Sequence, residues 1–333
     1  MSAEDLIRLQ QVSKVFTRKQ DMAAKLASRM GLAAKPEMVR AVDAVDLTVK
    51  KGEVVGLVGE SGCGKSTLGR MVAGIIKPSG GSVLYRDQYL EALSGPELRN
   101  RRLKVQMIFQ DPYSSLNPRL RVNEIIGEAP RVHGLVKGDI GTFIAEQMQR
   151  AGLDPAFARR YPHQFSGGQR QRIGIARALA VNPEFLVCDE SVAALDVSIQ
   201  AQILNLFMDL REQLGLTYLF ISHDLGVVEH IADRVAIMYL GRIVEEAPAE
   251  EVFARPNHPY AQALLAEVPR IDARKRRFAA IKGELPSPLH PPSGCHFHPR
   301  CPHAMDRCRI EAPVLREIAS GHRSACHLND KSH

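Results

Sequence analysis

The sequence predicts an α/β fold built on a mostly parallel sheet, and three observations lead to this prediction. A helical pattern runs from Lys65 to about Ile76, directly after an apolar strand-like run, so that strands alternate with helices. The length of 333 residues exceeds what one hydrophobic core usually supports, which favours a large domain with a smaller appendage. Short apolar runs with the length and composition of buried strands recur at residues 54–59, 185–188, 217–221 and 234–238.

The N-terminal segments indicate two further strands with an insertion between them. Residues 6–16 and 41–49 have the alternating pattern of half-buried strands. Residues 17–40 are basic and rich in Ala and Met, and we interpret them as a surface insertion. Contact with a membrane partner is the alternative for this insertion. A helical spacing within it is suggested by Met22, Leu26 and Met30.

Two other segments suggest units outside the sheet. After the first helix, which Pro78, Gly80 and Gly81 are expected to end, residues 122–160 carry two or three polar helical patterns. We therefore expect a helical subdomain at about residues 111–180. Pro-rich residues 286–299 are typical of a connector and lead into a cysteine-bearing tail. The expected division is a main domain of residues 1–255 and a C-terminal extension of residues 256–333.

The composition excludes several classes of protein. Hydrophobic residues make up 45% of the chain and charged residues 24%, as in ordinary folded proteins. The net charge of +7 suits an anionic partner but does not indicate nucleic-acid readout, and no nucleic-acid partner is expected. The sequence has no run of 18 apolar residues, and its start, MSAEDLIRLQ, does not resemble a signal peptide. We expect the chain to stay in the cytoplasm.

A phosphate-binding loop is predicted at residues 59–66, which read GESGCGKS. This Gly-x-x-x-x-Gly-Lys-Ser pattern lies between an apolar strand and a helix, where backbone N–H groups and the helix N-terminus can hold phosphates. Lys65 is expected to reach the β and γ phosphates, and the hydroxyl of Ser66 to hold Mg²⁺. The other residues expected to contact the nucleotide in this loop are Gly59, Ser61, Gly62, Cys63, Gly64 and Thr67.

An acidic pair ends the apolar run FLVCDE at residues 185–190. Asp189, at the end of a buried strand, can contact Mg²⁺ through water, and Glu190 can orient or deprotonate the attacking water. The alternative is that both acids cap the next helix. A phosphate loop elsewhere in the chain favours the catalytic interpretation.

A second glycine-rich segment, FSGGQRQR, lies at residues 165–172. Ser166 can cap a helix, and Gly167 and Gly168 expose its N-terminal amides to an anion, although alone this segment could be a simple turn. Gln169 completes the sequence SGGQ, and an apolar strand ending in Asp-Glu follows about twenty residues later. This order resembles the signature of ABC ATPases. The resemblance covers roughly residues 6–255.

This resemblance implies roles for residues outside the two loops. Gln110 in IFQDP corresponds to the glutamine loop and is a third expected contact to Mg²⁺, with Ser66 and Asp189. His223 in ISHD corresponds to the switch histidine and is expected to act in catalysis with Glu190. Phe16 is the aromatic residue expected to stack on adenine. The loop after the acidic pair corresponds to Ala194, Leu195 and Asp196.

The resemblance also implies that two such domains enclose two ATP molecules, with the phosphate loop of one facing the Ser166 loop of the other. The sequence holds one set of motifs, so a second ATPase subunit is expected. Two positions depart from the family pattern. Ser191 stands where proline is usual, and Ala193 where serine is usual. Both follow the acidic pair and leave it intact, so hydrolysis is still expected.

Several longer segments resemble the ATPase subunits of oligopeptide and dipeptide importers. Of these subunits, the F-type is the one that they resemble most. This implies a D-type sister ATPase, two membrane permeases and an extracytoplasmic solute-binding protein as partners. It also implies a peripheral location on the cytoplasmic face of the inner membrane. Nickel or another solute, or a non-transport ABC ATPase, are the alternatives. The segments include QDPYSSLNPR, NHPYAQALL and LPSPLHPPSGCHFHPRCPHAMDRC.

Four cysteines crowd the C-terminus: Cys295, Cys301, Cys308 and Cys326. Clustered thiols in a reducing cytosol suggest a metal site more than disulfides. Paired Cys-x2-Cys knuckles of the usual zinc pattern are absent from the sequence, and the longer intervals fit a [4Fe–4S] cluster better. Zinc and free thiols remain alternatives, because His296, His298, His303 and His327 stand nearby. Such a site is expected to be structural, since it lies far in sequence from every ATP motif.

Overall fold

The computed structural model describes residues 4–17, 37–111, 113–193, 195–267 and 283–330. Most of the expected insertion at residues 17–40, with its suggested helical spacing at Met22, Leu26 and Met30, lies outside these ranges. In the described part of the chain, no helix is long and apolar enough to cross a membrane.

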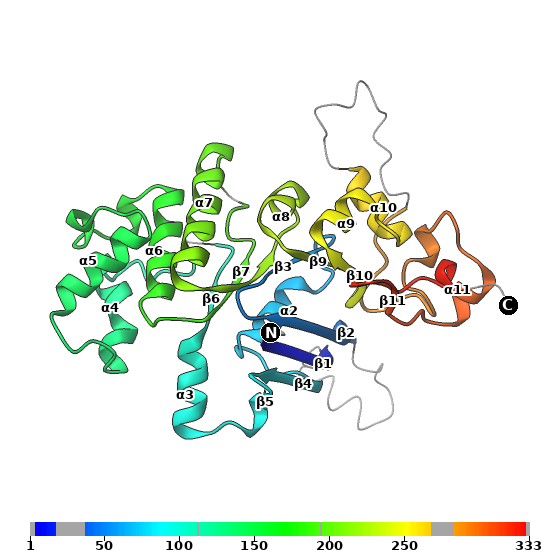
Figure 1. The fold of residues 1–333 in the computed structure, drawn as a ribbon, viewed down its shortest axis with the longest axis horizontal. Coiled ribbons are helices and arrows are strands. Elements are labelled where there is room, and N and C mark those ends of the chain that lie inside the picture. The colour runs from blue at the N-terminus through cyan, green and yellow to red at the C-terminus, as the bar shows by residue number, and fades with distance from the viewer. Residues whose placement is uncertain (1–3, 18–36, 112, 194, 268–282, 331–333) are drawn as a thin grey trace, which may run out of the picture.

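A sheet of eight strands forms the centre of the molecule (Figure 1). The neighbours among β9, β3, β8, β7 and β6 run parallel, as predicted, whereas β10, β11 and β12 pair antiparallel at the other edge. From edge to edge the order is β11 (Arg316–Ala319), β12 (His322–Ser324), β10 (Arg242–Pro248), β9 (Arg234–Tyr239), β3 (Val54–Val58), β8 (Thr217–Ile221), β7 (Phe185–Asp189) and β6 (Val105–Ile108).

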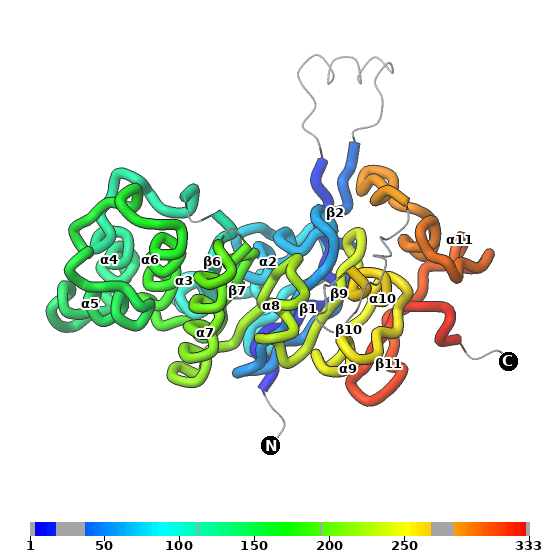
Figure 2. The backbone as a smooth tube through the Cα atoms, turned by 90° about the horizontal axis from the view of Figure 1, so that it is seen from above, coloured from blue at the N-terminus to red at the C-terminus, as the bar shows by residue number. Residues whose placement is uncertain are grey.

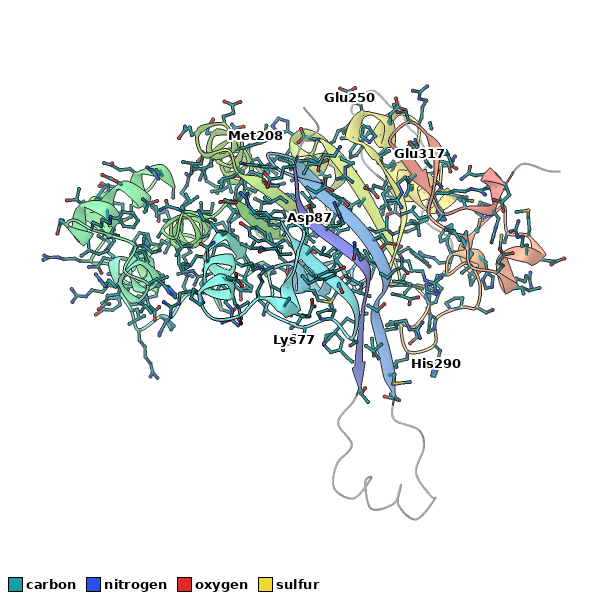
Figure 3. All side chains as sticks on the ribbon, turned by 60° about the horizontal axis from the view of Figure 1, so that its bottom comes forward. Lys77, Asp87, Met208, Glu250, His290 and Glu317 are labelled. Atoms are coloured by element: carbon teal, nitrogen blue, oxygen red, sulfur yellow. The ribbon has the colours of Figure 1, made fainter. Side chains whose placement is uncertain are left out.

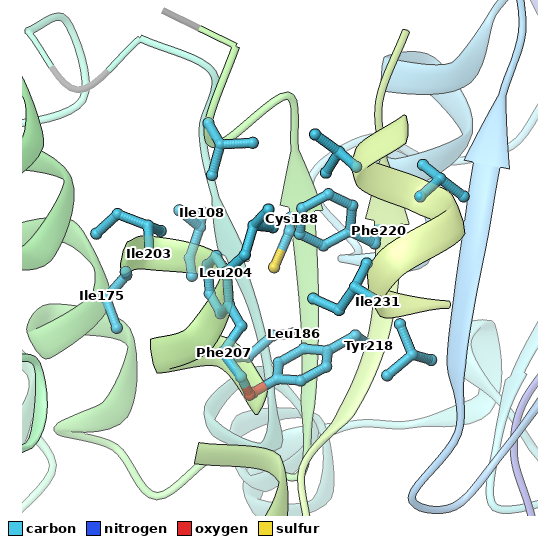
Figure 4. Packing of buried hydrophobic residues seen from close by; sticks show 14 of the residues in the cluster. Ile108, Ile175, Leu186, Cys188, Ile203, Leu204, Phe207, Tyr218, Phe220 and Ile231 are labelled. Carbon is cyan, nitrogen blue, oxygen red and sulfur yellow. The ribbon is translucent and has the colours of Figure 1, made fainter. Parts of the chain in front are cut away.

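The parallel strands are apolar because both faces of this sheet are covered. Alternate residues enter different cores, as the two-residue period of a strand requires. Tyr218 and Phe220 of β8 pack into the core beneath α6, α7 and α8 (Figure 4), while Leu219 and Ile221 pack into a second core on the opposite face. All four side chains are 0% exposed.

A second, antiparallel sheet covers the other face, with helix α2 between the two sheets. Helix α2 contacts β7 and β8 of the central sheet and β2 of this one. Strands β1 and β2 are long and run side by side beyond the body of the molecule (Figures 2 and 3). The strand order is β2 (Met38–Lys50), β1 (Asp5–Thr17), β4 (Gly80–Tyr85) and β5 (Gln88–Tyr89).

The helices fall into a group beside β6 and β7 and a group near β9 and β10 (Figure 1). Helices α4, α5 and α6 contact one another, which agrees with the expectation of helices in residues 122–160. In chain order they are α2 (Lys65–Val72), α3 (Gly95–Lys104), α4 (Val122–Val132), α5 (Ile140–Arg150), α6 (Gly167–Leu179), α7 (Val197–Leu214), α8 (Leu225–Ile231), α9 (Ala249–Ala254), α10 (Pro259–Ala266) and α11 (Asp306–Ile310). Short 3-10 turns lie at Leu90–Ala92, Pro155–Phe157, Pro162–Gln164, His298–Arg300 and His327–Asn329.

Helix α2 ends earlier than predicted, at Val72 instead of about Ile76. Gly74 follows with a left-handed φ of 73°, a common way to stop a helix. The buried Arg101 of α3 donates hydrogen bonds to the carbonyls of Val72 and Ala73, which satisfies two groups at this end. Burial lowers the pKa of Arg101 to about 10.

The C-terminal residues join the central sheet at its antiparallel edge. Glu245 and Glu246 of β10 pair with Ser324 and Arg323 of β12. Figure 3 shows Glu317 of this region and His290 of the extension to the right of Met208 of α7. The buried His322 also bonds Glu245, with Nε2 2.8 Å from Oε1. Strand pairing and side chains together hold the extension against the core.

Candidate functional site

The predicted site residues gather where four parallel strands end. The phosphate loop follows β3, Gln110 follows β6, Asp189 and Glu190 end β7, and His223 follows β8. Because these strands are parallel neighbours, their carboxyl ends meet at one edge of the sheet, the usual ligand position in open α/β folds. Residues scattered over more than 160 positions of sequence therefore lie in one place.

The phosphate loop is packed closely against neighbouring backbone. Gly59 has φ 151° and Gly64 has φ 109°, values that side-chain-bearing residues rarely adopt. A Cβ atom on Gly59 would lie 2.1 Å from the carbonyl oxygen of Met238, and one on Gly64 would lie 2.1 Å from that of Ala41. Glycine is therefore required at both positions for β9 and β2 to support the loop.

Lys65 is buried at the start of α2, with 4% of its surface exposed. Its ammonium donates hydrogen bonds to the carbonyl oxygens of Gly59, at 2.7 Å, and Glu60, at 3.0 Å. Both acceptors are uncharged, so the positive charge remains available to an anionic ligand. Together with the amides at the start of α2, this charge makes the loop a site for phosphate oxygens.

Ser66 and Asp189 come together as a candidate Mg²⁺ site. The Ser66 hydroxyl donates to Oδ1 of Asp189 at 2.8 Å, although the two residues are 123 positions apart. Burial raises the pKa of the Asp189 carboxyl, while the hydrogen bond from Ser66 lowers it by a smaller amount. A hydroxyl and a carboxylate are the hard oxygen donors that Mg²⁺ prefers beside phosphates, so these residues fit the ion.

Glu190 is held by contacts to both of its carboxylate oxygens. The amide of Gln110 donates to Oε2 at 2.7 Å, and Nδ1 of His223 lies 3.5 Å from Oε1. Glu190 itself has a left-handed φ of 45°, and its backbone N–H donates to Ile221 of β8. Its side chain is 14% exposed, whereas that of His223 is 56% exposed. The carboxylate is thus fixed at the site, and the histidine faces solvent beside it.

The Ser166 loop forms a helix start, as predicted, but on another part of the molecule. The Ser166 hydroxyl accepts from the backbone N–H of Gln169, and the Gln169 side chain accepts from that of Ser166, which is a capping box. A Cβ on Gly168 would lie 2.4 Å from Ile199 of α7. In Figures 1 and 2, α6 lies on the far side of β6 and β7 from α2. In the described part of the chain, the Ser166 loop therefore lies apart from the phosphate loop of the same chain.

The remaining predicted residues are placed as follows. Phe16 is 43% exposed and lies near the end of β1, where it pairs with Val39 of β2. Two residues further along β2, the carbonyl of Ala41 lies against Gly64 of the phosphate loop. Cys63 is buried, which raises the pKa of its thiol. Leu195 lies beside the Ser166 loop, since a Cβ built on Gly167 would be 3.7 Å from its Cδ2, whereas Ala194 lies outside the described residues. Ser61, Gly62 and Thr67 lie in the loop and the first turn of α2.

Three residues near the phosphate loop were missed by the sequence analysis: Glu60, Tyr260 and Arg300. The Glu60 backbone N–H donates to the Tyr260 hydroxyl at 2.9 Å, and the Glu60 carboxylate pairs with Arg300. Glu60 occupies a position that the loop pattern leaves open. Tyr260 and Arg300 lie about 200 residues or more further on, so no local signal connects them to the loop.

The four C-terminal cysteines line one small cavity, together with His258, His298, His303 and His327. Burial raises the pKa of the Cys295 thiol to about 11 and also raises the pKa values of Cys301 and Cys326. Within the ranges that the structure describes, no three His, Cys, Asp or Glu side chains form a group that could hold a metal ion. The cysteines therefore share one cavity without converging on one point.

Solved ATP-binding cassettes share this fold. One is a dimeric cassette in a post-hydrolysis state with bound ADP and phosphate. It is 30% identical to this chain and superposes with a TM-score of 0.61, and the match covers 73% of this chain and 99% of the cassette. Another is cbiO1 of Clostridium perfringens, part of the transporter complex cbiONQ, which is 25% identical with a TM-score of 0.63, over 76% of this chain and 92% of that one.

Comparison of sequences gives the same family. Residues 42–193 match the model of ABC transporters, and residues 244–308 match that of the oligopeptide/dipeptide transporter C-terminal region. Two Bacillus subtilis proteins are each 52% identical to this chain. The alignment with the putative oligopeptide transport ATP-binding protein YkfD covers 89% of this chain and 92% of YkfD. The alignment with the oligopeptide transport ATP-binding protein AppF covers 87% of this chain and 90% of AppF. The chain therefore belongs to the ABC transporter family, as an ATPase subunit that carries the C-terminal region of oligopeptide/dipeptide transporters.

Proposed function

We propose that this chain hydrolyses ATP to drive an importer of dipeptides or oligopeptides. The observation that carries the ATPase part is the convergence of Lys65, the Ser66–Asp189 pair and the Gln110–Glu190 pair at one edge of the sheet. The peptide part is supported by the oligopeptide/dipeptide C-terminal region and by the relatives named above.

We infer a task for each residue when ATP is bound as substrate, and the contacts support these tasks. Lys65 remains hydrogen-bonded to the carbonyls of Gly59 and Glu60 and directs its third N–H at phosphate oxygens, and the backbone of residues 59–66 holds the phosphates. Ser66, Asp189 and Gln110 would hold Mg²⁺, which neutralises charge developing on the phosphates. Glu190 accepts a proton from the attacking water, as the carboxylate at the end of β7.

Gln110 and His223 act on the carboxylate of Glu190 from opposite sides. The hydrogen bond from Gln110 fixes one oxygen, and the exposed His223 lies beside the other. Both oxygens of Glu190 are therefore positioned by neighbouring side chains at the end of β7. The stacking of Phe16 on adenine is part of the same proposal, supported by its exposed ring.

The Ser166 loop supplies the nucleotide site of a second ATPase chain. Its helix N-terminus can bind an anion, yet in this chain it lies across β6 and β7 from the phosphate loop. The related cassette with ADP and phosphate is described as dimeric. We propose a D-type sister subunit as the second chain, two permeases that bind the pair at the cytoplasmic face of the inner membrane, and an extracytoplasmic binding protein.

The identity of the solute is tested with the intact transporter. Its external binding protein is screened against dipeptides, oligopeptides and nickel, and each solute is then added to the transporter in vesicles with ATP. We expect peptides to bind and to stimulate hydrolysis, with nickel having no effect. Stimulation by nickel and not by peptides would refute peptide import, and copurification with ribosomes or DNA instead of permeases would indicate a non-transport ATPase.

Replacement of Glu190 by Gln tests the catalytic assignment. Gln keeps the shape and the contacts to Gln110 but cannot accept a proton, so we expect turnover in the assembled transporter to fall by about 100-fold or more. ATP should still bind, and the complex should accumulate in an ATP-bound form. The matched control is Glu229→Gln, an exposed position on α8, which should turn over normally. A Glu190→Gln transporter as active as the parent would assign the proton transfer to another group.

A [4Fe–4S] cluster at the four C-terminal cysteines is the second part of the proposal. Four thiols around one cavity are a donor set that suits such a cluster, and zinc with a nearby histidine is the alternative. Because burial raises the pKa values of Cys295, Cys301 and Cys326, binding must displace protons from neutral thiols. Bound there, the cluster would help to order a segment that has few large apolar residues.

Anaerobic purification tests this assignment. The expected result is a brown protein with visible absorption and stoichiometric iron and sulfide. Cys301→Ser should lose iron, whereas Cys188→Ser, in the buried core of β7, should retain it. A colourless parent protein with stoichiometric zinc would establish the alternative, and a protein without any metal would show that the thiols are free.

A further inference from the structure

A partly buried ion pair connects the C-terminal extension to the phosphate loop. Arg300 donates from both terminal nitrogens to the carboxylate of Glu60, at 2.7 and 2.9 Å, in the two-pronged geometry that fixes direction as well as distance. The Arg300 side chain is 6% exposed and that of Glu60 is 22% exposed. The pair raises the pKa of Arg300 above its ordinary value, chiefly through the hydrogen bond to Glu60.

Glu60 connects Arg300 to Lys65 through its side chain and its backbone carbonyl. The Glu60 side chain binds Arg300, its backbone N–H donates to Tyr260, and its carbonyl accepts from the Lys65 ammonium at 3.0 Å. Glu60 is therefore held on three sides. The side-chain contact to Arg300 and the backbone contact to Tyr260 therefore act on the residue whose carbonyl receives Lys65.

Aromatic packing makes the connection rigid. Phe297, three residues before Arg300, is 1% exposed and packs against Tyr239 and Tyr260, with ring centroids 5.3 and 5.4 Å away. Tyr239 and Tyr260 lie 4.6 Å apart, and the Tyr239 hydroxyl is 3.4 Å from Arg300. The extension thus contributes one buried ring to a three-ring cluster with Tyr239 and Tyr260, whose hydroxyl accepts from the Glu60 backbone N–H of the phosphate loop.

A buried ion pair gives little net stability compared with apolar packing, because both charges lose their hydration. What such a pair supplies here is a defined geometry. The extension is also attached independently, since β12 pairs with β10 and His322 bonds Glu245. Loss of Arg300 should therefore leave the extension in place and change the loop.

We propose that Arg300 is a positioning residue for ATP binding, which acts through Glu60 to hold the phosphate loop and Lys65 in the geometry that accepts phosphates. The extension lies far in sequence from the ATP motifs, and by this proposal it is part of the nucleotide site. Arg300 directly precedes Cys301, so the same short segment carries a cysteine of the cavity and the contact to the loop.

The test compares Arg300→Gln, Glu60→Gln and the double variant in the full-length chain and in the assembled transporter. We expect each single variant to weaken MgATP binding by about three- to thirtyfold, which lies within the range of coupling between contacting residues. KM for ATP should rise by a similar factor, with kcat within about twofold of the parent. The double variant should be no worse than either single one, because all three lack the same interaction. Arg300→Lys, which keeps the charge, should recover part of the affinity.

The matched control is Arg307→Gln. Arg307 also makes a two-pronged pair, with Glu311, but is 50% exposed and lies in the same extension away from the loop. Its ATP affinity should equal that of the parent. Thermal unfolding without nucleotide shows whether each variant is folded. Unchanged ATP affinity in a folded Arg300→Gln chain, or additive losses in the double variant, would overturn the proposal. The binding assay contains no solute, so its outcome is independent of peptide import.

Discussion

The close approach of the phosphate loop to its neighbours is the constraint on which the rest of the site depends. Gly59 and Gly64 allow the carbonyls of Met238 and Ala41 to come within a distance that no side chain would permit. The loop is thereby fixed against β9 on one side and β2 on the other. Once it is fixed, Lys65 and Ser66 start helix α2 beside the end of β7, and the Ser66–Asp189 contact follows from the parallel order of β3, β8 and β7.

The C-terminal extension has a place in this arrangement. It lengthens the central sheet through β12, inserts Phe297 against two tyrosines and contacts Glu60 of the phosphate loop through Arg300. The segment that matches the oligopeptide/dipeptide transporter C-terminal region therefore contacts the phosphate loop. The extension can influence nucleotide affinity without contributing a group to the reaction.

Much of the core could be predicted from the sequence because its signals are local. The apolar runs that became β3, β7, β8 and β9 are bounded by turn residues, and GESGCGKS is a continuous pattern. Strands β4, β5, β6, β10, β11 and β12 were missed, because short runs at an edge or in a polar context have weak periodicity. The early end of α2 depends on Arg101, and the role of Arg300 depends on Glu60, 240 residues away. Such contacts are set by tertiary packing, which no local pattern reports.

The central claim is that the Ser166 loop serves the nucleotide of another chain and not its own. The most direct test is Ser166→Glu, an exposed position where a negative charge would oppose the phosphates of a facing nucleotide. MgATP affinity is measured for the isolated full-length chain and turnover for the transporter assembled with its sister subunit. The account predicts unchanged affinity in the isolated chain and a loss of turnover of about 10-fold or more on assembly. Weaker ATP binding by the isolated variant, or full turnover in the transporter, would contradict it.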